Sequence, residues 1–260
     1  MGTITSADGT KIAYETHGHG PALIAVDGAN CHRAFGGMLP LAELLAPQFT
    51  VYAYDRRGRG QSGDTAPYAV RREVEDIAAL ITEAGGSAHL YGMSSGAILA
   101  MEAVASGLPV TKLALYEPPF TNEPDGDLAA AAKFNRDLDA LLAADRRADA
   151  VELFMTRVGV PAVAIAGMRR SPAWPQFEAI APTLAYDMAI VGDARVPRER
   201  AARITVPTLV LTGADTSPEL HAGSLAVAQA VPHARHQVLD GQSHQVDPAV
   251  LAPLLAEFFA

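Results

Sequence analysis

The chain has 260 residues, 49% of them hydrophobic, a formal net charge of −9 and a single cysteine, Cys31. This length allows one large domain with a buried core, whereas the negative charge argues against a nucleic-acid partner and the lack of a long apolar run argues against a membrane span. Because residues 1–9 carry no signal-peptide pattern and one cysteine excludes an intrachain disulfide, we expect a cytoplasmic protein.

Short apolar segments typical of strands alternate with segments typical of helices along most of the chain. The first two strands flank Asp8-Gly9, which is a hairpin turn signal. Strands are predicted at residues 3–6, 11–16, 22–26, 50–54, 90–92, 112–116, 208–212 and 236–239. Helices are predicted at residues 38–46, 70–83, 97–105, 218–230 and 248–259. This alternation predicts an α/β fold with a mostly parallel, doubly wound sheet.

The alternation stops between residues 118 and 206, where the sequence is alanine-rich, helical and interrupted by prolines. This segment contains the only tryptophan, Trp174. Because it follows the sixth strand, at the carboxyl end of the sheet, we expect it to cover the crevice there as a helical lid. The predicted organisation is a core of residues 1–117 and 207–260 with a lid of residues 118–206.

The segment Gly92-Met93-Ser94-Ser95-Gly96 lies between a predicted strand and a predicted helix. Strand, G-x-S-x-G and helix make a nucleophile elbow, a sharp turn that projects the serine hydroxyl beyond the sheet. Glycine fits at positions 92 and 96 because a side chain there would collide with neighbouring backbone. Ser94 is therefore the candidate nucleophile. Ser95 is out of register with the glycines, and we expect its backbone N–H to stabilise an oxyanion.

A serine hydroxyl needs a base to accept its proton and an acid to orient that base. His244 lies just after the last strand and is the last histidine in the chain, as the order serine, acid, histidine requires. Two carboxylates are candidates for the acid, because Glu117 follows the sixth strand and Asp215 follows the seventh. We favour Glu117 and expect Asp215 to be a hydrogen-bonded neighbour.

Oxyanion stabilisation requires two backbone N–H groups that point to where negative charge develops. Ser95 is expected to supply one, and the loop after the third strand the other, with Gly28 or Ala29 as the candidate. Asp27 is expected to hold this loop through hydrogen bonds to backbone N–H groups. The mechanism requires no metal and no organic cofactor.

Residues 55–62 are basic and glycine-rich but match no phosphate-binding pattern, so we expect a structural turn in which Asp55 bonds to its own loop. This loop, the elbow at 92–96, the loop at 213–218 and His244, in this order, resemble the α/β-hydrolase superfamily over nearly the whole chain. The resemblance implies an α/β-hydrolase fold with a helical lid inserted after the sixth strand. It also implies a serine hydrolase with a catalytic triad and an oxyanion hole.

The chain is also similar to the small lactonases that open macrocyclic resorcylic lactones such as zearalenone. The shared features are an Asp-Gly oxyanion loop, a Ser-Ser elbow, an acid after the sixth strand and a lid tryptophan, here Asp27-Gly28, Ser94-Ser95, Glu117 and Trp174. Asp215 departs from this pattern. In the wider superfamily the acid after the seventh strand usually stands one residue further on, where this chain has Thr216.

The sequence thus predicts a serine esterase or lactonase that works through an acyl-enzyme. An apolar lid favours a hydrophobic small-molecule ester or lactone, because burying an unpaired charge there is costly, and Trp174 and Ala29 are expected to contact this substrate. The same residues could serve carbon–carbon bond hydrolysis or cofactor-free perhydrolysis. The fold could also be a non-catalytic small-molecule receptor, although a complete set of serine, acid and histidine argues against it.

Overall fold

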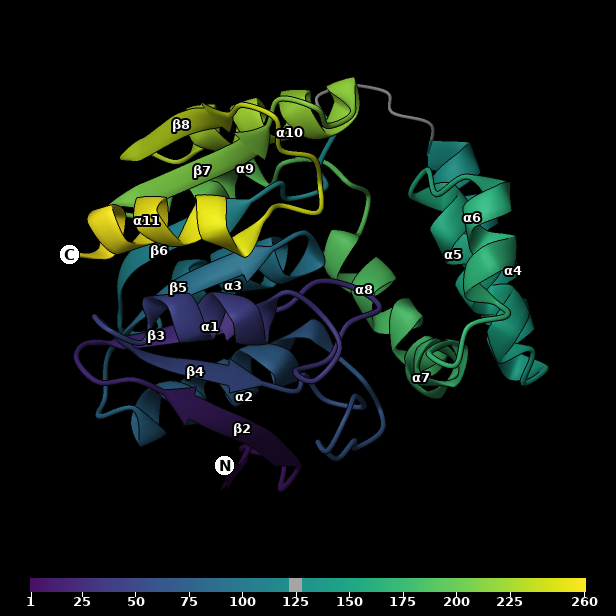
Figure 1. Ribbon diagram of the computed structural model, residues 1–260, viewed down its shortest axis with the longest axis horizontal. Coiled ribbons are helices and arrows are strands. Elements are labelled where there is room, and N and C mark those ends of the chain that lie inside the picture. Colours follow the sequence, from purple (N-terminus) through teal and green to yellow (C-terminus); the bar gives the residue numbers. More distant parts are fainter. Residues whose placement is uncertain (122–127) are drawn as a thin grey trace.

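The computed structural model describes residues 1–121 and 128–260. Within these residues the strands form one sheet in the order β1-β2-β4-β3-β5-β6-β7-β8, in which β2 alone runs against its neighbours (Figure 1). The strands are β1 (Gly2–Thr5), β2 (Lys11–His17), β3 (Ala22–Val26), β4 (Thr50–Tyr54), β5 (Ala88–Met93), β6 (Val110–Tyr116), β7 (Thr208–Gly213) and β8 (Ala234–Leu239). The predicted mostly parallel sheet is confirmed.

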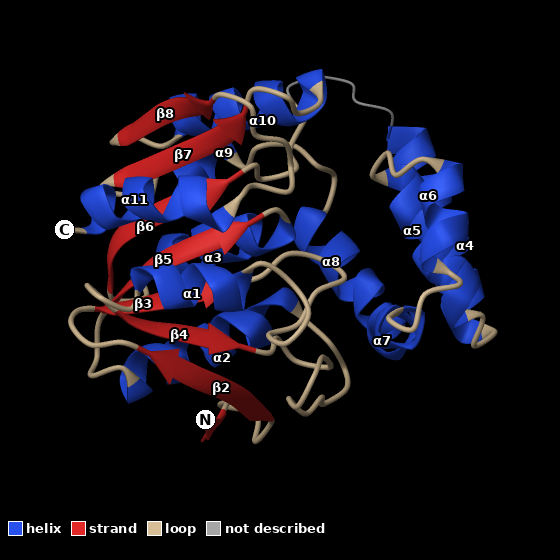
Figure 2. Cartoon of the chain, in the orientation of Figure 1, coloured by secondary structure: helices blue, strands red, loops and turns tan. Residues whose placement is uncertain are grey.

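Helices cover both faces of the sheet (Figure 2). On one face α1 (Met38–Leu45) and α11 (Pro248–Phe259) enclose a core of side chains that includes Leu41, Leu255 and Phe259. The opposite face is covered by α2 (Val70–Glu83), α3 (Ser95–Ala105) and α10 (Pro218–Ala230), around a second core that includes Ile77, Leu99 and Val227. The five predicted helices outside the 118–206 segment all form. In the part of the chain that the structure describes, none of the helices could cross a membrane.

The described chain between β6 and β7 is mostly helical, and we call residues 128–206 the insertion. Its helices are α4 (Leu128–Ala143), α5 (Arg147–Arg157), α6 (Ala162–Met168), α7 (Trp174–Ile180), the 3-10 turn η1 (Ala181–Thr183), α8 (Leu184–Val191) and α9 (Arg198–Ala201). Residues 122–127 of the predicted lid lie outside the described residues. Helices α4 to α7 stand beside the ends of the central strands, and α8 connects them to the sheet (Figure 1).

The insertion has two parts that pack differently. Phe134, Phe154 and Trp174 belong to a hydrophobic core of its own. Ile190 at the end of α8 and Ile204 after α9 instead join the main core beside α3. The last part of the insertion therefore packs with the sheet domain, and the division at residue 206 stays a prediction.

Candidate active site

Ser94 lies at the turn between β5 and α3, and its backbone is in an unusual conformation, with φ 55° and ψ −125°. A side chain on Gly96 would place Cβ 2.4 Å from the main-chain oxygens of Val26 and Asp27. A side chain on Gly92 would meet the Gly96 carbonyl at 2.5 Å. These contacts involve backbone that cannot move aside, so the turn requires both glycines. Such a strained turn is the geometry of a nucleophile elbow.

Glu117 and His244 form a hydrogen-bonded pair next to this elbow. Nδ1 of His244 is 2.6 Å from Oε2 of Glu117. The carboxylate is fully buried, and it also accepts hydrogen bonds from the Gly213 N–H at 2.8 Å and from the Thr216 hydroxyl at 3.1 Å. The backbone N–H of Ser94 donates to the carbonyl of Tyr116, the residue before Glu117, so the serine and the acid follow neighbouring strands.

Asp215 does not join this pair. The residue is exposed, and its backbone N–H donates to the carbonyl of Gln242 at 2.8 Å. No side-chain hydrogen bond or ion pair links Asp215 to another described residue. Of the two candidate acids, the structure brings Glu117 to His244 and leaves Asp215 facing solvent.

The loop after β3 carries the expected oxyanion donors, but one of them is engaged. The Gly28 N–H donates to Oδ1 of Asp27 at 2.9 Å, as the prediction for Asp27 required. This bond competes with the expected role of Gly28 as an oxyanion donor. The N–H groups of Ala29 and Ser95 donate to no acceptor among the described residues. A Cβ on Gly28 would lie 3.2 Å from Cβ of Ser94, so this loop passes directly beside the candidate nucleophile.

Burial raises the pKa of the Asp27 carboxyl group. The side chain is buried, and its Oδ2 has no hydrogen-bond partner. Desolvation raises the pKa of Asp27 from 3.8 to about 6, although the Gly28 N–H and the nearby Arg59 and Arg56 cations oppose this change. A carboxyl group that changes charge near neutral pH therefore lies in the oxyanion loop.

Trp174 differs from its expected role as a substrate contact. Its side chain is only 5% exposed and packs inside the core of the insertion. The indole N–H donates to Glu178 at 3.0 Å, and the ring lies 5.8 Å from that of Phe177. A side chain with so little free surface offers a substrate almost no contact. Ala29, the second expected contact, is half-buried and packs against the same core.

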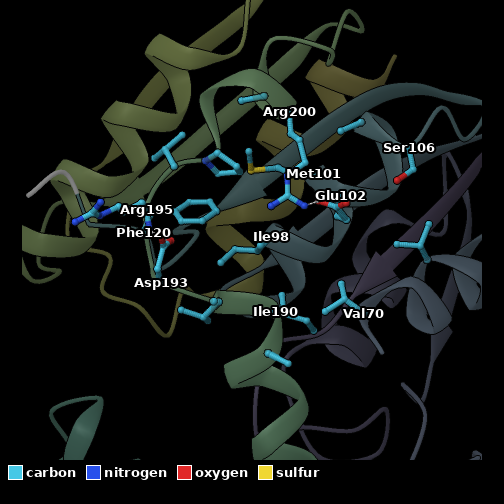
Figure 3. Close-up of a pocket in the computed structure, with 18 of the residues that line it drawn as sticks. Val70, Ile98, Met101, Glu102, Ser106, Phe120, Ile190, Asp193, Arg195 and Arg200 are labelled. Carbon is cyan, nitrogen blue, oxygen red and sulfur yellow. Dashed lines mark hydrogen bonds and ion pairs between the residues drawn. The ribbon is translucent and has the colours of Figure 1, made fainter. Parts of the chain in front are cut away.

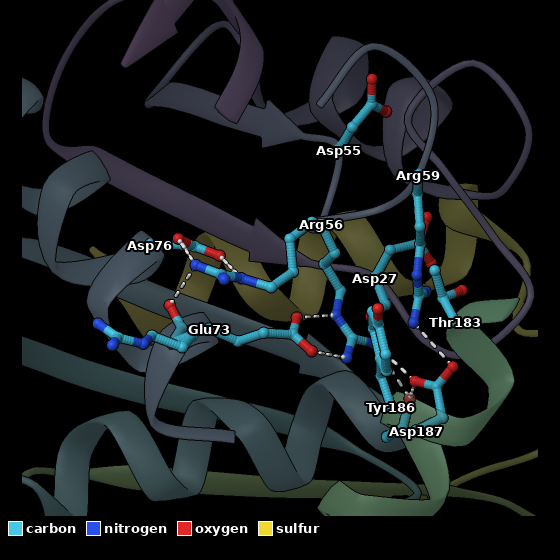
Figure 4. A network of polar contacts seen from close by, with 12 residues as sticks. Asp27, Asp55, Arg56, Arg59, Glu73, Asp76, Thr183, Tyr186 and Asp187 are labelled. Atoms are coloured by element: carbon cyan, nitrogen blue, oxygen red, sulfur yellow. Dashed lines mark hydrogen bonds and ion pairs between the residues drawn. The ribbon is translucent and has the colours of Figure 1, made fainter. Parts of the chain in front are cut away.

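Buried arginines in the 55–62 loop are the main feature that the sequence reading missed. Asp55 accepts a hydrogen bond from the Gln61 N–H at 2.8 Å, so the expected turn is confirmed. Arg56, Arg57 and Arg59 are each at most 1% exposed and pair with carboxylates. Figure 4 shows Arg56 beside Glu73 and Arg59 beside Asp187. A signal was present in α2, where Glu73 and Asp76, the partners of Arg56 and Arg57, are three residues apart on the buried face of the helix. The partner of Arg59, Asp187, comes from α8.

A cavity of about 830 Å³ lies away from the candidate catalytic residues, beside α3 and the last part of the insertion (Figure 3). Its lining includes Ile98, Met101 and Phe120, and its rim carries an ion pair between Arg200 and Glu102 at 3.0 Å. Ser94, Glu117 and His244 are not among the described residues that line it. No group of three or more metal-ligating side chains occurs in the described ranges 1–121 and 128–260.

A model of the alpha/beta hydrolase family matches residues 16–254. The chain belongs to this family. An alpha/beta hydrolase from Sphaerobacter thermophilus is similar over 100% of both chains, with 49% identity and a TM-score of 0.91. The enol-lactonase from Burkholderia xenovorans has the same fold, with 24% identity, a TM-score of 0.71 and coverage of 98% of this chain and 99% of that one.

Another relative is similar over a shorter part of the chain, and its name states a substrate. The N-formylmaleamate deformylase of Pseudomonas putida is 38% identical over 119 residues, which is 44% of each chain. The family match and the strand order agree with the fold expected from the sequence.

Proposed function

We propose that this alpha/beta hydrolase is a serine hydrolase that cleaves an ester or lactone of an uncharged, hydrophobic small molecule. The observation that carries the proposal is the 2.6 Å contact between His244 Nδ1 and the buried Glu117 carboxylate, beside a strained elbow that bears Ser94. A carboxylate on Nδ1 holds the imidazole with Nε2 free to act as a base, and it stabilises the imidazolium that forms.

In the first half of the reaction, Oγ of Ser94 attacks the carbonyl carbon while Nε2 of His244 takes the hydroxyl proton. The carbonyl π electrons move to oxygen, and the backbone N–H groups of Ser95 and Ala29 stabilise that oxyanion. The intermediate then collapses, the bond to the leaving alkoxide breaks, and His244 returns its proton to that oxygen. A lactone opens in this step, and its alcohol remains attached to the acyl group.

In the second half a water molecule attacks the acyl-enzyme, with His244 again accepting the proton. The second oxyanion forms at the same two N–H groups. Its collapse breaks the bond to Ser94 Oγ, and His244 returns the proton to this oxygen. The products are a carboxylic acid and an alcohol, or one hydroxy acid from a lactone, and the enzyme is restored without a metal or organic cofactor.

The surroundings of the oxyanion loop support an uncharged substrate. Arg56 and Arg59 approach this loop, but both guanidinium groups already pair with Asp187. Phe35 follows this loop, and the centroid of its ring lies 4.5 Å from that of Phe177 in the insertion, in an edge-to-face arrangement. A substrate carboxylate at this position would lose water without gaining a cation, so hydrophobic acyl groups are favoured.

A fluorophosphonate probe with peptide mapping tests the nucleophile. We expect one modified residue, Ser94, in the folded wild type and none in heat-denatured protein. Ser94→Ala should abolish labelling and lower kcat on the order of 10⁴-fold or more while preserving the fold. Modification of Ser95, or no modification of folded protein, would refute the mechanism.

A substrate panel tests the class of bond. Short and bulky p-nitrophenyl esters, lactones and N-formyl amides should be compared, the amides because one relative is an N-formylmaleamate deformylase. We expect kcat/KM to rise from acetyl esters to bulkier hydrophobic esters or lactones. Turnover of the formyl amides alone would reassign the chain to acyl–nitrogen hydrolysis with the same triad.

A further inference from the structure

One carboxylate of the insertion reaches the back of the active site. Asp187 lies on α8, is completely buried and accepts three hydrogen bonds through its two oxygens. Its donors are Arg56 Nη1 at 2.8 Å, Arg59 Nη2 at 2.7 Å and the Ser95 hydroxyl at 2.8 Å (Figure 4). We call these four side chains the Asp187 network.

The two arginines of this network continue to the oxyanion loop. Arg59 Nη1 donates to the carbonyl of Gly28 at 2.6 Å and to that of Cys31 at 3.3 Å. Arg56 Nη1 donates to the carbonyl of Asp27 at 3.3 Å. The Gly28 carbonyl belongs to the same peptide unit as the Ala29 N–H, the proposed oxyanion donor, and the Asp27 carbonyl belongs to the unit before it. The orientation of the loop thus depends on where Asp187 holds the two guanidinium groups.

The buried charged groups of the Asp187 network stabilise one another. Although burial alone raises it, the Arg59 and Arg56 cations hold the pKa of Asp187 below its ordinary value, so the group is ionised. Arg56 also pairs with Glu73 through Nε at 2.7 Å and Nη2 at 2.8 Å. Removing one partner from such a buried set leaves uncompensated charge, which is strongly unfavourable. The part of α8 around Asp187 is therefore fixed to the core.

We propose that Asp187 is a positioning residue for the oxyanion hole, acting through Arg56 and Arg59 on the loop and through Ser95 on the elbow. The proposal rests on the proposed function. Asp187 contacts the Ser95 side chain, whose backbone N–H is one donor, and it orients the loop that supplies the other. Because both donors depend on one carboxylate of the insertion, displacement of α8 weakens transition-state stabilisation.

The chain offers a matched control for a buried ion pair. Arg57 pairs with Asp76 at 2.7 and 2.9 Å, and Asp76 is 1% exposed. Arg57 otherwise bonds to Asp8 and to the Arg72 carbonyl, neither of which belongs to the oxyanion loop or the elbow. Asp187→Asn and Asp76→Asn each neutralise one buried acid that pairs with an arginine of the 55–62 loop, and only Asp187 is linked to the proposed oxyanion hole.

The two variants should be compared by melting temperature and by kcat and KM on one p-nitrophenyl ester, with active sites counted from the acylation burst. We expect both variants to have a lower melting temperature than the wild type. Asp187→Asn should lower kcat on the order of 10²-fold, the loss typical of an impaired oxyanion hole, with little change in KM. Asp76→Asn should keep kcat within about twofold. Equal kcat values for the two variants per active site would overturn the proposal.

Ser95→Ala provides a second test, which also applies if Asp187→Asn does not fold. It removes the hydroxyl bond to Asp187 but keeps the backbone N–H. We expect an approximately tenfold lower kcat, an unchanged KM and a melting temperature within a few degrees of wild type; wild-type kcat would contradict the inference. Fluorophosphonate labelling of wild-type Ser94 separates the two proposals. If the probe does not label Ser94, the serine mechanism itself is refuted. If the probe labels Ser94 but kcat of Asp187→Asn and Ser95→Ala is unaffected, only the role of the Asp187 network is refuted.

Discussion

The hydroxyl of Thr216 donates a hydrogen bond over 3.1 Å to Oε2 of Glu117, the same oxygen that His244 Nδ1 contacts. Thr216 stands at the position where other members of the superfamily usually place the triad acid. Here that position supplies a donor to a carboxylate from the neighbouring strand. Together with the Gly213 N–H, it fixes the orientation of a fully buried Glu117 side chain.

Replacement of each candidate acid should separate their roles. We expect Glu117→Gln to lower kcat about 10³- to 10⁴-fold, because an amide at this position favours the wrong imidazole tautomer and cannot stabilise the imidazolium. Asp215→Asn should change kcat by less than about threefold, since this side chain is exposed and bonds to no described residue. Steady-state kinetics on one ester provide the measurement. If Asp215→Asn lowered kcat more than Glu117→Gln, the triad acid would be Asp215, after β7, instead of Glu117.

Much of the fold could be predicted because its signals are local. The elbow, the apolar strands and the helices beside them depend on short-range patterns, and all eight strands appear within a few residues of their expected positions. The preference for Glu117 over Asp215 followed from the loop after the seventh strand, where Thr216 stands at the usual position of the acid. Thr216, the partner of Glu117, was identified only as a departure from the usual loop, because a hydrogen bond between residues 99 positions apart leaves no local pattern.

The arginine-rich loop could not be interpreted from its own residues. Charged side chains are usually exposed, and the carboxylates that neutralise Arg56 and Arg59 come from α2 and, more distantly, from Asp187 on α8. The role of Trp174 could not be predicted from the sequence for a related reason. A lone tryptophan in an insertion can line a site or fill a core, and only the packing of α5 and α7 decides between them.

The elbow should not tolerate a methyl group at Gly96. A Cβ there would lie 2.4 Å from two backbone oxygens, so we expect Gly96→Ala to displace Ser94 or the oxyanion loop and to lower both kcat and melting temperature. Gly167→Ala is the matched control, because Gly167 lies in α6 with no heavy atom within 4 Å of its added Cβ. It should be neutral or stabilise by up to about 1 kcal/mol. Equal behaviour of the two variants in activity assays and thermal melts would argue against a sterically closed elbow.

Trp174→Ala should act on stability rather than on specificity. The indole is buried in the core of the insertion, where truncation of a large aromatic typically costs about 3–5 kcal/mol. We expect a clear fall in melting temperature and an unchanged ratio of kcat/KM values between bulky and acetyl esters. Val163→Ala, on the 85% exposed Val163 of α6, should leave both unchanged. A selective loss of activity on bulky esters at wild-type stability would restore Trp174 as a substrate contact.

Asp27 should make the folded state less stable as the pH rises from about 4 to 6. Its pKa is raised from 3.8 to about 6 in the folded protein, mainly by desolvation. Below this window the carboxyl is neutral in both states, and within it the folded protein binds more protons than the unfolded chain, so stability falls with pH. Above pH 6 the penalty is complete, at about 3 kcal/mol. This contribution has the opposite sign to that of a paired surface carboxylate.

Asp27→Asn should remove this penalty, because an amide keeps an oxygen for the Gly28 N–H and carries no charge. We expect the variant to be more stable than wild type at pH 7 and to lose this advantage progressively toward pH 4. Urea unfolding at several pH values gives the difference directly, since every other titrating group is common to both proteins. Asp240→Asn, at an exposed position, should show no such divergence. If the Asp27→Asn advantage were the same at pH 4 and pH 7, the buried carboxyl would not titrate between them, and some other feature of the loop would explain the difference.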